Sequence, residues 1–131
     1  MIMPDATARC VGHIEVIYMK LPPKERRLFG AVWLWCITQG YTDVSTPDDW
    51  DFTKAGEIIR FIPASEMSYP ALSLRIARAK EQCDHMYVVI NDSSQCDNIA
   101  KHIPAFCGIF CNDNPFGLGQ TVRILRVPSS D

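Results

Sequence analysis

The chain has 131 residues, of which 47% are hydrophobic and 21% charged, and its formal net charge is −2. This length suffices for one domain with a core, so we expect a single domain over residues 1–131 with loose ends at 1–12 and 128–131. The slightly acidic balance excludes a global basic field that would draw the protein onto nucleic acid or an anionic membrane.

The apolar segments are too short to cross a membrane. The longest run, residues 29–37, is well below the roughly 20 residues that a membrane span needs. The first residues also lack the apolar stretch of a signal peptide. We therefore expect a cytoplasmic protein without membrane contact, and we leave open whether Met1 or Met3 is the start and what the oligomeric state is.

The cysteines are even in number, but no secretion signal accompanies them. We therefore expect free, mostly buried thiols rather than disulfides. Cys107 and Cys111 could form a zinc pair with His102 and His85. In a strand, however, residues four apart are separated by about 13 Å, too far for one zinc ion. We expect no metal or other cofactor. The six cysteines are Cys10, Cys36, Cys83, Cys96, Cys107 and Cys111.

The first third of the chain predicts a helix and a strand. Residues 13–20 alternate weakly and fit either a strand or the start of a helix. Pro23 suits a helix start, and apolar residues then recur with helical spacing over residues 24–38. Gly40 is a typical residue just after a helix end. Residues 41–46 predict a short strand.

Residues 48–91 form the centre of the predicted fold. We expect a strand over 50–53, a hairpin turn at Lys54-Ala55-Gly56 with positive φ at Gly56, and a strand over 57–63. A helix over 69–83 and a strand over 85–91 follow. Both faces of this last strand are apolar, which is typical of a central strand that is covered on each side.

The remaining segments complete a mixed pattern. We expect a short helix over 94–102 that begins near Asp92, a strand over 106–111, a loop over 112–119 and a strand over 120–127. This order predicts an α/β fold, with a mixed sheet that has helices on both faces.

Phrases along most of the chain match a known superfamily. The matching segments are Gly40-Tyr41, Asp49 or Asp51, Lys54-Ala55-Gly56-Glu57, residues 58–65, Cys83-Asp84-His85-Met86-Tyr87-Val88-Val89, Ile103-Pro104, Gly108-Ile109 and residues 122–128. Together they resemble the PD-(D/E)XK superfamily, and most closely its small DNA-repair proteins of the MmcB type. The resemblance implies a restriction-endonuclease-like fold over residues 22–128.

The resemblance also implies where catalytic residues would lie. In that superfamily an aspartate and a glutamate bind Mg²⁺, and a lysine two residues past the glutamate assists the attacking water. The corresponding positions here hold Ile62, Pro63 and Ala64, so that only an aspartate and Ser65 remain. A single carboxylate holds Mg²⁺ poorly. We therefore expect no enzyme activity.

A displaced nuclease site is an alternative. Glu66 could join Asp49 and Asp51, with Glu25 and Lys80 nearby, to bind Mg²⁺ and cut nucleic acid. The competing interpretation is that Glu66 is only a carboxylate that favours a helix start.

Three groups of residues are candidates for binding. Arg75 and Arg78 lie three apart on one helix with Lys80, and they could meet phosphates or form an ordinary solvated face. Trp33 and Trp35 lie about 200° apart around their helix, so either one is exposed for a partner or the helix is buried on two sides.

The third candidate group surrounds an aromatic residue. Trp50 stands among Asp48, Asp49 and Asp51, which predicts either a solvated loop or an acidic, aromatic tip that docks on a basic partner.

These observations favour a catalytically inactive nuclease fold that binds a protein. We expect an inhibitor or adaptor that acts on a nucleic-acid-processing complex, of the anti-defence or immunity type, and this step rests on analogy between folds. The alternatives are an accessory protein that binds DNA or RNA in repair or mobile-element biology, and a divergent Mg²⁺ nuclease.

Overall fold

The computed structural model of this chain describes residues 17–64, 67–112 and 122–129. The predicted α/β class and mixed sheet are confirmed, and the sheet has six strands. The elements are α2 (Pro23–Thr38), β1 (Thr42–Asp43), β2 (Trp50–Lys54), β3 (Glu57–Pro63), α3 (Tyr69–Ala79), β4 (His85–Ile90), a 3₁₀ turn η1 (Ser93–Gln95), α4 (Cys96–Ala100), β5 (Cys107–Asn112) and β6 (Val122–Arg126).

Several predictions fall partly or wholly outside the described residues. They concern Cys10, Ser65, Glu66, the first half of the segment 13–20 and most of the loop 112–119. Residues 17–20 are helical, as one of the two predictions for that segment has it. No helix in the described ranges is long and apolar enough to cross a membrane.

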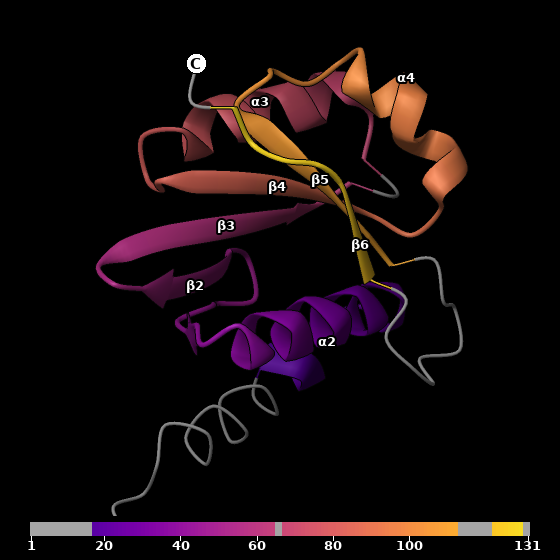
Figure 1. The fold of residues 1–131 in the computed structure, drawn as a ribbon. Helices are drawn as coiled ribbons and strands as arrows, with labels where there is room; N and C mark the ends of the chain where they lie inside the picture. The colour runs from indigo at the N-terminus through magenta and orange to yellow at the C-terminus, as the bar shows by residue number, and fades with distance from the viewer. Residues whose placement is uncertain (1–16, 65–66, 113–121, 130–131) are drawn as a thin grey trace, which may run out of the picture.

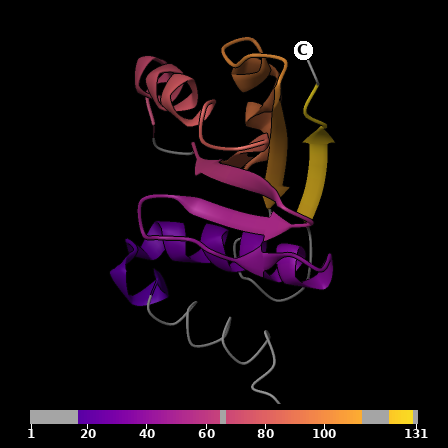
Figure 2. The same ribbon diagram turned by 90° about the vertical axis from the view of Figure 1, so that its left-hand side faces the viewer.

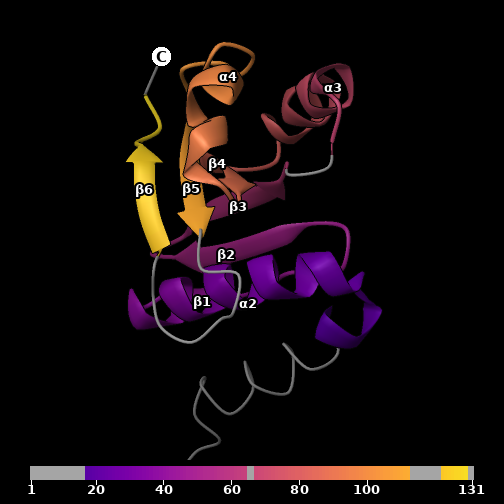
Figure 3. The ribbon, with the colours of Figure 1, turned by 90° about the vertical axis from the view of Figure 1, so that its right-hand side faces the viewer.

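The sheet runs in the order of the sequence, from β1 to β6 (Figures 1 and 3). The first three strands are antiparallel, β3, β4 and β5 are parallel, and β6 returns antiparallel to β5. One face is covered by α2, and the other by α3 and α4, which makes three layers (Figure 2). The predicted cover on both faces is thus confirmed.

The hairpin between β2 and β3 sets the register of the polar site described below. Lys54 pairs with Glu57, so only Ala55 and Gly56 lie in the turn, with φ of 54° and 82°. Two successive positive φ angles are typical of a type I′ turn, which matches the twist of the two strands. Gly56 was expected to have positive φ, but Ala55 was not.

Helix boundaries agree with the prediction at α2 but not at α3. Gly40 has φ of 90°, as expected after a helix end. Helix α3 begins at a Ser68 cap and ends at Ala79, four residues earlier than predicted. It ends early because Asp84 is already bound to β3: its amide donates to the Ile58 carbonyl (2.8 Å), and its carboxylate accepts from the Ile58 amide (2.7 Å).

Two other elements are shorter than predicted. The first strand has two residues instead of six, because Ser45 Oγ bonds the Asp51 backbone and the chain turns. The helix predicted over 94–102 is a 3₁₀ turn followed by five α-helical residues. Its predicted cap is confirmed, because the Asp92 carboxylate accepts from the Ser94 amide, and this bond lowers the pKa of Asp92.

The two faces of the sheet carry different cores. Aromatic rings dominate the α2 face, and branched aliphatic side chains dominate the face under α3 and α4. The aromatic core includes Phe29, Trp50, Phe52, Phe61 and Phe110. The aliphatic core includes Ile62, Leu72, Ile76, Met86, Val88, Ile90, Ile99, Ile103 and Ile109. Strand β4 contributes to both cores, as its apolar faces predicted.

The five described cysteines are free thiols, as predicted, and three of them are buried. Burial raises the pKa of Cys36, and it raises the pKa of Cys107 to about 12 and that of Cys83 to about 11. These thiols therefore stay neutral at physiological pH, and they pack as small apolar side chains.

Candidate functional site

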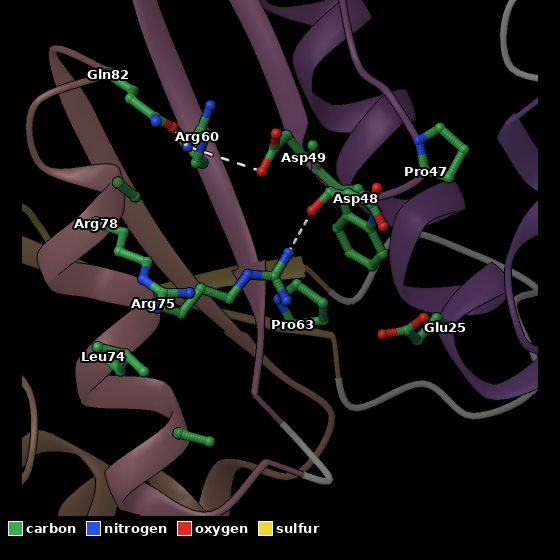
Figure 4. A pocket seen from close by; sticks show the side chains of 13 residues that line it. Glu25, Pro47, Asp48, Asp49, Arg60, Pro63, Leu74, Arg75, Arg78 and Gln82 are labelled. Carbon is green, nitrogen blue, oxygen red and sulfur yellow. Dashed lines mark hydrogen bonds and ion pairs between the residues drawn. The ribbon is translucent and has the colours of Figure 1, made fainter.

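A pocket of about 540 Å³ opens between α3, the loop that precedes β2 and the first turn of α2 (Figure 4). Helix α3 forms one wall, and strand β3 forms the floor. The lining residues are Glu25, Pro47, Asp48, Asp49, Trp50, Arg60, Pro63, Ala71, Leu74, Arg75, Arg78, Ala79 and Gln82.

Arg60 is the central side chain of the pocket floor. Its Nε donates to Asp51 Oδ1 (2.7 Å) and its Nη2 to Asp51 Oδ2 (2.8 Å), so the pair is bidentate. Its Nη1 donates to Gln82 Oε1 and lies 3.8 Å from Asp49 Oδ1. The hydrogen bond to Asp51 raises the pKa of Arg60 despite its burial. Asp51 is therefore already neutralised by a partner within the protein.

Arg60 was absent from the predicted site, although the sequence contained the signal for it. Once the turn is placed at Ala55-Gly56, counting back along both strands sets Asp51 opposite Arg60, and this is the observed pairing. Residues opposite each other in an antiparallel pair have side chains close enough to interact.

The two positions that hold hydrocarbon side chains where the resemblance would place catalytic groups lie under α3. Ile62 and Ala64 are 0% and 5% exposed and belong to the aliphatic core. They share the Arg60 face of β3, because side chains alternate along a strand. A side chain at either position would project into the packed layer beneath α3, not into the pocket.

The residues predicted for a displaced metal site do not all meet. Asp49 and Glu25 line the pocket. Asp51 is not a lining residue, but it binds Arg60 on the pocket floor. Lys80 is not among the lining residues, and its Nζ lies 4.8 Å from the centre of the Phe106 ring. Glu66 lies outside the described residues. Within the described ranges, no three His, Cys, Asp or Glu side chains form a group that could hold a metal ion.

Arg75 and Arg78 come together as predicted, and both line the pocket from α3. Arg75 Nη2 donates to the backbone carbonyl of Asp48, which ties α3 to the loop before β2. No carboxylate in the described part of the chain forms an ion pair with either arginine. Their charges therefore face the pocket without an anionic partner among the described residues.

The prediction of an exposed ring at Trp50 is wrong. Trp50 is 1% exposed, and its ring packs edge-on against Phe29 at 5.2 Å between ring centres. The period-two alternation of β2 explains this, because Trp50 and Phe52 face α2 whereas Asp51 lies on the other face and binds Arg60. Asp48 is exposed and Asp49 half-buried, so the acidic part of the predicted surface is present without its aromatic part.

The tryptophans of α2 lie away from the pocket. Trp33 and Trp35 are both half-buried and pack against the aromatic core, so neither is the exposed anchor that one prediction allowed. Trp35 packs edge-on against Phe110 at 5.6 Å between ring centres. The indole nitrogen of Trp33 is buried and has no hydrogen-bond partner among the described residues.

Comparisons with protein-family models, curated proteins and solved structures find no match to this chain.

Proposed function

We propose that this protein is a restriction-endonuclease-like domain that binds without cutting. Its role would be that of an inhibitor or adaptor that docks, as a protein partner, on a nucleic-acid-processing complex of the anti-defence or immunity type. The resemblance noted in the sequence supplies the fold and the biological setting, and that part of the proposal rests on analogy between folds.

The observation that carries the proposal is the bidentate pairing of Asp51 with Arg60 beside two hydrocarbon positions. Mg²⁺ requires several oxygen ligands and keeps its hydration shell unless negative charge is concentrated on it. Here Asp51 is occupied by a guanidinium, and Ile62 and Ala64 offer no ligand. A divalent ion that approached Asp51 would meet a positive charge less than 3 Å from the carboxylate oxygens.

Two features support a protein as the partner. The net charge of −2 gives no general attraction to nucleic acid. The pocket also combines charged side chains with apolar ones, notably Leu74, which is 53% exposed. Mixed surfaces of this kind are typical of protein interfaces.

The test combines an affinity pull-down from the native host with a nuclease assay. We expect one stoichiometric protein from a nucleic-acid-processing complex, and we expect its activity to change when the purified chain is added. Plasmid incubated with the chain and Mg²⁺ or Mn²⁺ should remain intact. Nicking that disappears in Asp51→Ala would refute the proposal and establish the divergent Mg²⁺ nuclease instead.

A second candidate is a DNA-binding accessory protein, and the half-buried Arg75 and the exposed Arg78 on one face of α3 favour it. Arginine side chains bind phosphates, and that binding weakens steeply as salt rises. A gel-shift series with duplex and single-stranded DNA tests this candidate. A salt-sensitive shift that Arg75→Ala and Arg78→Ala abolish would favour it over protein binding.

A further inference from the structure

The pocket has two walls of opposite charge. On one side α3 presents Arg75 and Arg78. On the other side the loop before β2 presents Asp48 and Asp49, and the first turn of α2 adds Glu25 (Figure 4). Arg60 lies on the floor between the walls, and Asp51 already neutralises it.

The charges of the two walls are largely available to a ligand. Arg75 donates to a backbone carbonyl, which carries no formal charge, and the remaining N–H groups of its guanidinium have no partner among the described residues. No interaction holds the Arg78 guanidinium in the described part of the chain. Asp48 is exposed, and Asp49 is linked only weakly to Arg60, at 3.8 Å.

Apolar side chains also line the pocket. Leu74 is 53% exposed on α3, one residue before Arg75, and Pro47, Pro63 and Ala71 line the same pocket. The exposed Leu74 side chain offers area on which an apolar side chain of a ligand is buried, and such burial favours binding.

We propose that this pocket binds a polypeptide segment with a matching arrangement of charges. An acidic side chain of the segment accepts hydrogen bonds from Arg75 and Arg78, and a basic side chain faces Asp48 and Glu25. An apolar side chain of the segment covers Leu74, which belongs to the α3 wall. This inference rests on the proposed function and describes the chemistry by which that protein partner is recognised.

A nucleic-acid strand does not fit this arrangement. A strand carries a negative charge at every phosphate, about 3.4 Å of helix axis apart along each strand. Phosphates next to one that contacts Arg75 would approach the carboxylates of Asp48, Asp49 and Glu25. A polypeptide avoids this repulsion, because the sign of its charge can change from one side chain to the next.

The test begins with selection of random peptides displayed on phage against the immobilised full-length chain. We expect enriched peptides to combine an acidic, an apolar and a basic residue. The best peptide is then labelled and titrated by fluorescence polarisation against wild type and variants. Because charge-assisted hydrogen bonds are lost and a like charge is introduced, Arg78→Glu should weaken binding at least about tenfold.

A matched control and a charge exchange sharpen the result. Lys101→Glu makes the same change of charge at an exposed residue next to α4, outside the pocket, and should leave peptide affinity unchanged. Replacing the acidic residue of the peptide by lysine should restore binding to Arg78→Glu. Thermal unfolding of each variant confirms that these surface changes leave the fold intact.

The inference is overturned if no peptide is enriched, if the enriched peptides lack the mixed charge pattern, or if they bind Arg78→Glu as tightly as wild type. It is also overturned if a single-stranded oligonucleotide binds more tightly than every peptide and the same substitution abolishes that binding. Metal-dependent nicking of plasmid would refute the proposed function alone, because it leaves the peptide measurements in place.

Discussion

The two faces of the sheet differ in the kind of side chain that the same strands place on them. Under α2 the strands contribute an aromatic core, in which Phe61 lies within 6.5 Å of the rings of Trp35, Phe52, Tyr87 and Phe110. On the opposite face β3, β4 and β5 carry an aliphatic core, but β2 carries Asp51 there and the middle of β3 carries Arg60. Arg60 lines the pocket, and Asp51 binds it there.

This difference shows how one strand contributes both to the cores and to the pocket. Along β3, alternate residues face α2 and belong to the aromatic core. The residues between them point to the opposite face. There Arg60 lines the pocket, and Ile62 and the following Ala64 lie beneath α3. The α2 face carries an aromatic core, whereas the α3 face leaves a pocket at the edge of its helical cover. Four predictions follow from this contrast, in order of decreasing effect.

The largest effect is expected in the aliphatic core, at the two positions where the resemblance would place catalytic residues. Ile62→Glu combined with Ala64→Lys would bury charges in a packed apolar layer, and should destabilise the protein by about 4 kcal/mol or more without creating nuclease activity. Urea unfolding and plasmid nicking measure the two outcomes. Ile58→Glu, on the same face of β3 but half-buried, should cost much less. A stable, Mg²⁺-dependent nuclease from the double variant would contradict our account of this face.

The second prediction breaks the polar pair at the pocket. Asp51→Ala leaves the Arg60 guanidinium, whose side chain is 9% exposed, without its carboxylate, and should cost about 2–3 kcal/mol. Asp49→Ala is the matched control, because its side chain is 45% exposed and lies 3.8 Å from Arg60, and it should cost under about 1 kcal/mol. If urea unfolding showed the same loss of unfolding free energy in both variants, the Asp51–Arg60 pair would not be the main stabilising contact of the pocket floor.

The third prediction concerns the aromatic face at β5. A Cβ atom at Gly108 would lie 2.6 Å from the Tyr87 ring and 2.7 Å from the Arg126 carbonyl oxygen. Gly108→Ala should therefore cost about 1–3 kcal/mol through overpacking. Gly30→Ala, in α2, meets nothing within 4 Å and should be neutral or stabilise by up to about 1 kcal/mol. A melting temperature for Gly108→Ala equal to that of wild type would disprove this tight contact.

The smallest effect is the alkaline response of the thiols. The pKa of Cys83 is raised to about 11 from 9.0 because burial disfavours the thiolate. Between these two values the folded state holds more protons than the unfolded state, so stability should fall as pH rises from about 9 to about 11. Urea midpoints across this range measure the slope. In Cys83→Ala the slope should be shallower, and an unchanged slope would assign the response to other groups.

The order of elements followed from sequence alone, because hydrophobic period and turn residues are local signals. They placed β3 and β4 within a residue, identified Gly40 and Gly56, and showed that β4 would be covered on both faces. The resemblance also identified Ile62 and Ala64 as the hydrocarbon positions to examine. These inferences needed no knowledge of which segments meet in space.

Only the tertiary structure decided what the polar residues do. It buried the ring of Trp50, joined Asp51 to Arg60, separated Lys80 from the pocket, and placed Arg75 and Arg78 opposite Asp48, Asp49 and Glu25. The physical reason is that a side chain's charge is specified by its residue type, whereas its partner depends on strand register and helix placement. Those are long-range properties, and a one-residue change in register would turn each side chain to the other face.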